Sequence, residues 1–255
     1  MKRIIGLIGL YTNGAVIQTV GFKPKNIVHA SSLHAVHKFY SSGIDEIIIV
    51  DLSPGGLDFE LVQQYISQIL TKCFIPVVYA GFVSSPFKAD QLFRLGVDRI
   101  LMCSQLLDGD FSVSSYIIGK YGSQALIAGI DADCFSLNAK CSSRLVSQPE
   151  PFTVKHHLSI LHSLGVTEIC LNSPVSDGLR RGYALTSDTP HLIEFANHLQ
   201  FSLIAMGGAW EIEHFTDAAN LGFSGLSAAN CFHYREAYPL LIKKSLKNQG
   251  FDVVL

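Results

Sequence analysis

The chain has 255 residues, 48% of them hydrophobic, so it can bury one large core or two modest ones. Its formal net charge of −2 argues against a nucleic-acid partner, because such proteins normally carry a basic stripe or patch. No apolar stretch reaches the roughly 18 to 20 residues of a membrane span, and no small-residue cleavage site follows the first apolar run. We therefore expect an unprocessed protein that neither enters a membrane nor binds nucleic acid.

The cysteines and histidines indicate the compartment and the cofactor requirement. The six cysteines form no CxxC pair, and four of them lie in apolar surroundings, which is typical of a reduced, cytoplasmic protein. His34 and His37 share a predicted helix face, and His156 and His157 are adjacent, but neither pair has a carboxylate or cysteine at ligand spacing. We expect no metal ion and no cofactor.

Short apolar runs alternate with longer amphipathic segments along the chain. Residues 57–72 follow the helical pattern, since their apolar positions recur mostly at three- and four-residue steps. Eight apolar runs separated by such helices favour a closed (β/α)8 TIM barrel over an open doubly wound sheet, the alternative. We expect one barrel domain over residues 1–255, with strands within 3–10, 46–52, 75–81, 99–103, 125–131, 168–173, 201–208 and 224–229.

An internal repeat supports the barrel. Residues 43–53 align with 165–175 at an offset of 122, and residues 95–104 align with 221–230 at an offset of 126. The run 76–82 matches its counterpart in the second half at that second offset. Two equivalent half-barrels of four strands each would close into one ring.

The longest stretches expected to be irregular are 17–31 and 134–151. They follow the first and the fifth strand, which are equivalent places in the two halves. Long loops at the C-terminal ends of barrel strands usually cover a substrate. We therefore expect both stretches near the mouth of the barrel.

Three aspartates, Asp131, Asp51 and Asp177, stand at positions where catalytic residues are expected. The apolar run 125–134 ends on Asp131 and Asp133, and because barrel active sites are assembled from strand C-termini, the Asp131 carboxylate can point into the mouth. A turn or cap is the alternative role. Asp51 ends its strand in the same way, and Asp177 precedes Gly178, so a turn-forming role competes there with an acid or base role.

Small residues after the last two strands predict an anion site. Gly207 and Gly208 offer backbone amides just before a predicted helix, while Ala229 and Asn230 stand at the mouth of the last strand. Loops after the seventh and eighth strands of a barrel often cradle a phosphate. A plain tight turn is the alternative.

The equivalent place in the first half is altered. Gly81 and Ser104 are present there, but Phe82 occupies the position that corresponds to Gly208. A bulky ring narrows the approach to the backbone amides. The first half is therefore predicted to hold either a weakened phosphate site or an apolar subsite.

Four segments together resemble the cyclase subunit of imidazole glycerol phosphate synthase: residues 121–132, 176–183, 203–215 and 228–236. The resemblance runs nearly from end to end. It implies a (β/α)8 barrel with a half-barrel repeat that works in a heterodimer with a glutaminase subunit. Ammonia from the glutaminase would pass along the barrel axis and react at the top with a doubly phosphorylated ribulosyl nucleotide, giving imidazole glycerol phosphate and an aminoimidazole carboxamide ribotide.

The resemblance also implies roles for individual residues. Asp131 corresponds to the catalytic acid or base on the fifth strand, with Asp177 as a second candidate. The other implied mouth residues are Asp51, Asn172 and Ser173. The implied phosphate sites are Gly207, Gly208, Ala229 and Asn230 in the second half, with Gly81 and Ser104 as the remnant of the first.

At the opposite end of the barrel the resemblance implies an ammonia gate. Its residues are Arg3, Glu46, Arg99 and Glu168, and Asp98 corresponds to a contact with the glutaminase. The alternative is a solvated face of strand starts. The mixed signs of these four charges favour a paired ring around a narrow axis.

The departures from the family concern the first half-barrel. The offset of 122 from Asp131 leads to Gly9, followed by Leu10 and Tyr11, so the family's first aspartate is missing. A triple-glycine loop has become Ala80, Gly81 and Phe82, and Gln18 and Thr19 stand where the family has a lysine. Ring closure needs a proton donor and a proton acceptor, and one carboxylate cannot easily serve as both.

Three hypotheses remain. The favoured one is a paralogue that keeps the glutaminase dock and the ammonia path but supplies ammonia for amidation of a bacterial surface-sugar precursor, since residues 19–36 resemble that subgroup. The second is a working cyclase of histidine biosynthesis in which Asp177 or Tyr11 replaces the lost aspartate. The third is a non-catalytic interaction barrel.

Overall fold

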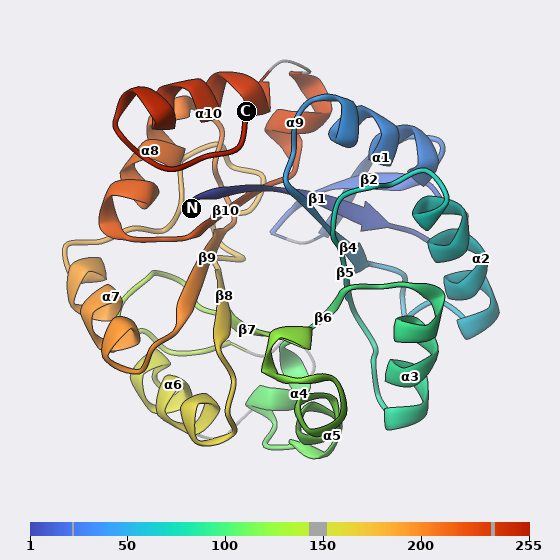
Figure 1. The fold of residues 1–255 in the computed structure, drawn as a ribbon, viewed down its shortest axis with the longest axis horizontal. Helices are drawn as coiled ribbons and strands as arrows, with labels where there is room; N and C mark the ends of the chain where they lie inside the picture. The colour runs from blue at the N-terminus through green and yellow to red at the C-terminus, as the bar shows by residue number, and fades with distance from the viewer. Residues whose placement is uncertain (22, 143–151, 236–237) are drawn as a thin grey trace.

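The computed structural model describes residues 1–21, 23–142, 152–235 and 238–255. Eight parallel strands form a closed barrel in which β1 pairs with both β4 and β10. Helices surround this barrel on all sides (Figure 1). The barrel strands are β1 (Arg3–Leu10), β4 (Glu46–Asp51), β5 (Val77–Ala80), β6 (Arg99–Met102), β7 (Leu126–Asp131), β8 (Glu168–Asn172), β9 (Ser202–Met206) and β10 (Gly225–Ala228). The predicted (β/α)8 fold and each predicted strand are confirmed.

The helices alternate with the strands along the chain. The outer layer contains α1 (Ser32–Ser41), α2 (Phe59–Leu70), α3 (Pro86–Leu95), α5 (Ser112–Tyr121), α6 (Val154–Ser163), α7 (Thr189–His198), α8 (Ile212–Leu221) and α10 (Tyr238–Asn248). Shorter helical turns are α4 (Ser104–Leu107), η1 (Ser123–Ala125) and α9 (Asn230–Tyr234). Over the described residues, no helix combines the length and the hydropathy needed to cross a bilayer.

Local sequence signals explain where α3 begins and ends. The Ser85 hydroxyl accepts a hydrogen bond from the Lys88 backbone N–H at 3.2 Å, and Pro86 occupies the first turn, where its missing N–H is not needed. The helix stops at Gly96, which adopts a left-handed φ of 103°.

The strands are apolar on both faces, as expected for a covered parallel sheet. Outward side chains pack under the helices in one large core. Inward side chains line the barrel axis with a separate, smaller cluster: Ile5, Leu7, Ile48, Val78, Ala80, Ile127, Cys170, Ile204 and Met206. This inner cluster lies between the two ends of the barrel.

The stretch 17–31 is not irregular, so that prediction is wrong. It lies mainly in an antiparallel hairpin of β2 (Val16–Val20) and β3 (Lys23–His29), attached to β1. The β-branched residues of β2 suit a strand, and Gly21 turns the chain with φ of 60°. Pro24 is tolerated because β3 is the edge strand. The other long stretch, 134–151, lies in part outside the described residues.

Candidate functional site

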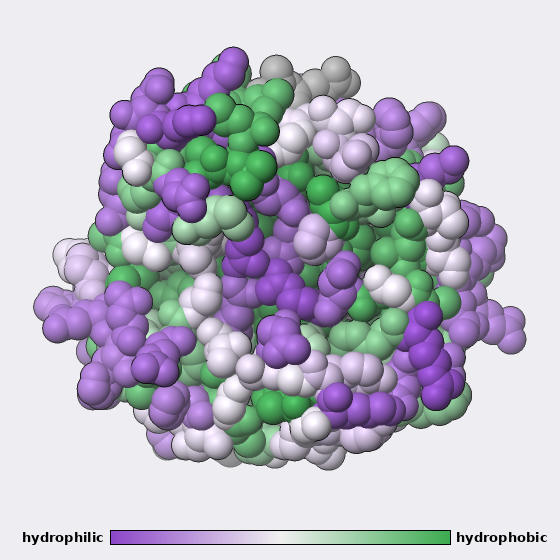
Figure 2. Space-filling view, in the orientation of Figure 1, coloured by the Kyte–Doolittle hydropathy of each residue, from purple (hydrophilic) through white to green (hydrophobic). Residues whose placement is uncertain are grey.

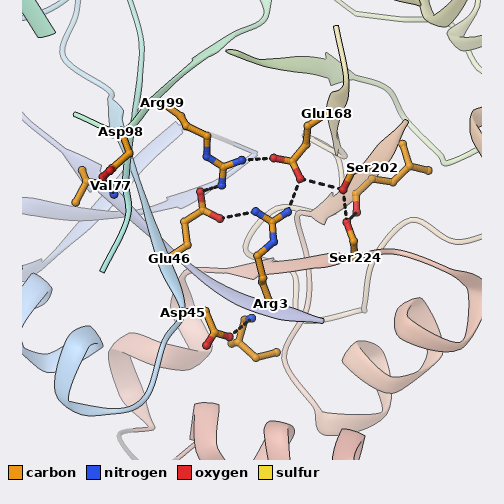
Figure 3. Close-up of polar contacts among 11 residues, drawn as sticks. Arg3, Asp45, Glu46, Val77, Asp98, Arg99, Glu168, Ser202 and Ser224 are labelled. Carbon is orange, nitrogen blue, oxygen red and sulfur yellow. Dashed lines mark hydrogen bonds and ion pairs between the residues drawn. The ribbon is translucent and has the colours of Figure 1, made fainter. Parts of the chain in front are cut away.

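Four charged side chains form a closed ring at the end of the barrel where the strands begin (Figure 3). Arg3 and Arg99 each donate to both Glu46 and Glu168, so every carboxylate oxygen of the two glutamates accepts one guanidinium N–H. The Arg3 Nη1 to Glu46 Oε2 distance is 2.9 Å. The structure confirms that these four side chains pair with one another, as predicted.

The ring is largely withdrawn from water. The side chain of Glu46 is 2% exposed, and those of Glu168 and Arg99 are 10% and 18% exposed. Burial lowers the pKa of Arg99, and the adjacent Glu168 opposes that change. Because paired charges in such surroundings are screened little, removing one partner would leave an uncompensated charge.

Two serines extend the ring on one side. Ser202 Oγ donates to Glu168 Oε1 at 3.0 Å and lies 2.6 Å from Ser224 Oγ, which in turn donates to the Leu203 carbonyl oxygen. Figure 3 shows this chain of hydroxyls leading away from Glu168. The serines therefore fix the orientation of that carboxylate.

The predicted partner contact, Asp98, lies on the same end of the barrel. Its Oδ2 accepts the Val77 backbone N–H at 2.8 Å, and the residue is exposed. Figure 2 shows this face of the molecule: polar residues gather at its centre, over the strands, and apolar areas adjoin them. Contiguous exposed apolar areas of this kind often mark sites of protein–protein contact.

At the other end of the barrel, Asp131 is paired with Asn172. Asn172 Nδ2 donates to Asp131 Oδ1 at 2.6 Å. The Asn172 Oδ1 atom is buried and, among the described residues, has no hydrogen-bond partner. Asp131 and Asn172 both line the larger cavity of the mouth, as predicted. This pair offers acceptor atoms to a bound molecule.

The strand register shows which residue occupies the place of the missing first aspartate. Asp131 pairs with Asn172 between β7 and β8, and the equivalent pair between β1 and β4 is Gly9 with Val50. A Cβ atom on Gly9 would lie 2.6 Å from the Leu52 Cδ1 atom and 3.0 Å from the Ile17 carbonyl oxygen. The space that a first aspartate would occupy is therefore filled by neighbouring residues.

Asp51 lines the same cavity, but its carboxylate accepts hydrogen bonds from the loop that follows β4. Oδ1 accepts the Ser53 N–H at 3.0 Å, and Oδ2 accepts the Leu57 N–H at 2.7 Å. Asp51 is 4% exposed. We expect Asp51 to shape this loop rather than to exchange protons.

The larger cavity, of about 430 Å³, lies over the first half-barrel and reaches the Asp131–Asn172 pair. Apolar residues such as Leu52, Val83 and Met102 contribute much of its wall, and Gly81 and Ser104 also line it. Phe82 lines it as well, with a left-handed φ of 53° that is unusual for a residue with a side chain. Phe82 is thus part of the cavity wall, and its effect on access to the backbone amides stays a prediction.

A smaller cavity of about 30 Å³ lies over the second half-barrel. It contains the predicted phosphate-binding residues Gly207, Gly208, Ala229 and Asn230. Both glycines have left-handed φ angles, and a Cβ atom on Gly208 would lie 2.3 Å from the Gly182 carbonyl oxygen. No other residue type fits there without a shift of the backbone.

Two arginines stack on Trp210 beside this smaller cavity. The Arg180 guanidinium carbon lies 3.8 Å from the centre of the Trp210 ring system, and that of Arg235 lies 4.5 Å away. Arg180 and Trp210 line the cavity, and Arg235 is paired with Glu211. This arrangement places a cation next to Gly207 and Gly208, where an anion would be stabilised.

The other two predicted mouth residues have partners within the protein. Asp177 lines the smaller cavity, and its Oδ2 accepts the Thr19 hydroxyl at 2.7 Å, which connects the loop after β8 to the hairpin. Ser173 is fully buried, and its hydroxyl donates to the Asp133 carbonyl oxygen at 3.2 Å. Tyr11 lines neither cavity among the described residues.

No cluster of three or more histidine, cysteine or carboxylate side chains at metal-binding distance occurs in the described part of the chain. Sequence reasoning misses the stack on Trp210, the Ser202–Ser224 pair and the Thr19–Asp177 contact. The stack on Trp210 has a signal in the sequence, because Trp210 is the single tryptophan and closely follows the glycine pair.

Comparison with known proteins identifies the family. The family described as "Histidine biosynthesis protein" matches residues 3–238. The chain belongs to this family. Similar proteins include the imidazole glycerol phosphate synthase subunits HisF of Campylobacter jejuni (29% identical over 99% of this chain and 98% of the relative) and of Chlorobium phaeobacteroides (26% identical over 100% and 99%). The HisF subunit of Campylobacter lari is 29% identical over 99% of this chain and 98% of its own length.

Proposed function

We propose that this HisF-like barrel, a single domain over residues 1–255, pairs with a glutaminase subunit in the cytoplasm and receives ammonia through its axis. The observation that carries the proposal is the closed ring of Arg3, Glu46, Arg99 and Glu168 at the entrance of the barrel. Relatives named as subunits of imidazole glycerol phosphate synthase support a partner.

The interior of the barrel favours the passage of neutral ammonia over that of the ammonium ion. The axis between the ring and the mouth is lined by apolar side chains such as Ile5, Ile48 and Ile127. Transfer of an unpaired cation into such surroundings is very unfavourable, whereas a small neutral molecule meets no such barrier. The ring would have to part briefly for ammonia to enter.

We further propose that the ammonia supplies amidation of a surface-sugar precursor. The first half of the mouth lacks a second acid at Gly9 and carries Phe82 in its phosphate loop. A cyclase needs a donor and an acceptor of protons within reach of its substrate. The loss of one acid beside a retained ring favours delivery of ammonia over ring closure.

A working cyclase remains the second candidate. Asp131 with Asn172 at the mouth, and full-length similarity to HisF subunits, favour it. In that case Asp131 would be the acid or base and Gly207, Gly208, Ala229 and Asn230 would hold one phosphate of the substrate.

The test of the conduit is stimulation of a glutaminase by the barrel. The partner glutaminase is assayed for glutamine hydrolysis with increasing amounts of barrel, and we expect saturable stimulation. Asp98→Asn keeps an oxygen that can accept the Val77 N–H but removes the charge, and should raise the half-saturating concentration by roughly tenfold. The control is Asp108→Asn, which follows α4 on the mouth side and should leave the curve unchanged. Absence of any stimulation would refute the pairing.

A further inference from the structure

The two cavities of the mouth differ in charge. The larger one contains the carboxylates of Asp51 and Asp131, and none of the described residues that line it is a lysine or an arginine. The smaller one contains Arg180 beside Gly207 and Gly208, together with Asp177, whose carboxylate accepts the Thr19 hydroxyl. Arg180 and the glycine amides favour an anionic group at the second cavity, whereas the two carboxylates of the first cavity disfavour one there.

Two backbone donors of the loop after β4 are already used within the protein. The Ser53 and Leu57 amides donate to Asp51, so they are not available to an external anion. The Phe82 ring covers the same loop, since a Cβ atom on Gly56 would lie 2.7 Å from that ring. The cation that interacts with Asp51 is Lys88 on α3, which is half-buried and does not line the cavity. A phosphate here would therefore face the carboxylates of Asp51 and Asp131, with no lysine or arginine among the described residues that line the cavity.

The polar atoms of the larger cavity fit a neutral group. Asn172 Oδ1 is a buried acceptor with no partner among the described residues, and a buried acceptor gains most from a donor supplied by a ligand. On other parts of the lining, Ser84, Ser104 and Gln105 carry uncharged donors that suit a carbonyl or hydroxyl oxygen. Apolar residues surround these atoms.

We infer that the mouth binds a molecule with two unlike ends. A single phosphate or similar anionic group lies at Arg180, Gly207 and Gly208, and an uncharged, largely apolar group with an N–H donor, such as an acylamino group, fills the larger cavity with its N–H toward Asn172. A molecule with a phosphate at both ends is excluded. The inference rests on the proposed function and deepens it, because ammonia that leaves the barrel axis would meet the neutral end beside Asp131.

The experiment compares two probes of equal framework: 4-acetamidophenyl phosphate and 1,4-phenylene bisphosphate. Binding to the full chain is followed by the fluorescence of Trp210, the single tryptophan, and by titration calorimetry. Inorganic phosphate measures the second cavity alone. We expect the acetamido probe to bind at least tenfold more tightly than the bisphosphate, and phosphate to bind with a stoichiometry of one.

Phe82→Gly provides the matched variant, because glycine adopts the left-handed backbone of that position without strain. It should reduce the preference for the acetamido probe at least fivefold while leaving the affinity for inorganic phosphate unchanged. Phe87→Ala, an exposed ring on α3 that does not line the cavity, is the control and should change neither. Equal or tighter binding of the bisphosphate, or two phosphates per chain, would overturn the inference. The glutaminase assay is read separately, so either conclusion can fail alone.

Discussion

Asn172 donates a 2.6 Å hydrogen bond to Asp131 across the β7–β8 boundary, and the matching boundary between β1 and β4 holds Gly9 opposite Val50. The two half-barrels thus share one backbone register but differ in the chemistry at their mouths. A polar pair in one half is an apolar pair in the other. This asymmetry is the basis of the proposed change in function.

An acid introduced at Gly9 in the first half-barrel should destabilise the protein. Gly9→Asp would place a Cβ atom against Leu52 and Ile17, and would bury a charge, so we expect a loss of at least about 2 kcal/mol in the free energy of unfolding. Gly119→Ala on α5 is the control, because a Cβ atom there would meet nothing within 4 Å, and alanine favours a helix. Urea unfolding measures both. A Gly9→Asp protein as stable as the parent would show that the space is available.

The four-charge ring should be sensitive to the loss of one member. Arg99→Met leaves Glu46 and Glu168 with one cation between them, and we expect a destabilisation on the order of 3 kcal/mol by urea unfolding. Arg94→Met, an exposed arginine on α3, is the matched control and should leave the unfolding midpoint almost unchanged. Equal effects of the two substitutions would mean that the ring contributes nothing beyond surface charge.

Stability should fall in mild acid because a buried histidine resists protonation. Burial lowers the pKa of His157 to about 4, with a smaller effect of the neighbouring His156, while the unfolded chain keeps a value near 6.5. The folded protein therefore binds fewer protons than the unfolded chain below pH 6.5, and stability decreases from there toward pH 4, at up to about 1.4 kcal/mol per pH unit for this group.

His157→Leu should reduce that pH dependence of the urea midpoint, and the buried His233, whose pKa burial lowers to about 3, should account for part of the slope that remains. His191→Leu, whose parent side chain is 71% exposed on α7, should leave the slope unchanged. An unaltered slope in His157→Leu would assign the acid sensitivity to other groups.

Phosphate should change the fluorescence of Trp210. Binding beside Gly207 and Gly208 would draw the Arg180 guanidinium toward the anion and alter its stacking on the indole ring. Arg180→Ala should weaken phosphate binding by roughly tenfold, the scale expected for one charge-assisted contact. Arg181→Ala is the neighbouring control, and chloride at matched ionic strength corrects for screening. A phosphate response that survives Arg180→Ala would place the anion elsewhere.

Much of the fold can be predicted because the apolar period and the repeat both reflect the barrel. The strand at 126–131 and its partner at 168–172 are plain apolar runs, and their offset from the first half locates Gly9 as the counterpart of Asp131. The hairpin is not predicted in this way, because its second strand carries lysines and a proline and, among the described residues, has no strand paired with its outer edge.

The sequence predicts the site only where the position of a single residue at a strand end identifies it. Asp131 and the glycine pair stand directly at strand ends, so position alone identifies them. The hydrogen bonds that Asp51 accepts from its own loop depend on how residues 53–57 fold around the carboxylate. The stack of Arg180 on Trp210 and the contact of Thr19 with Asp177 join distant segments, which no local pattern encodes.

The most direct test of the central claim is an ammonia-dependent cyclase assay. The purified chain is supplied with an ammonium salt and the phosphorylated ribulosyl intermediate of imidazole glycerol phosphate synthesis, and product is measured over time. We expect no turnover by a protein that still stimulates its glutaminase. Turnover that Asp131→Asn abolishes would contradict this expectation, and would identify the chain as a working cyclase.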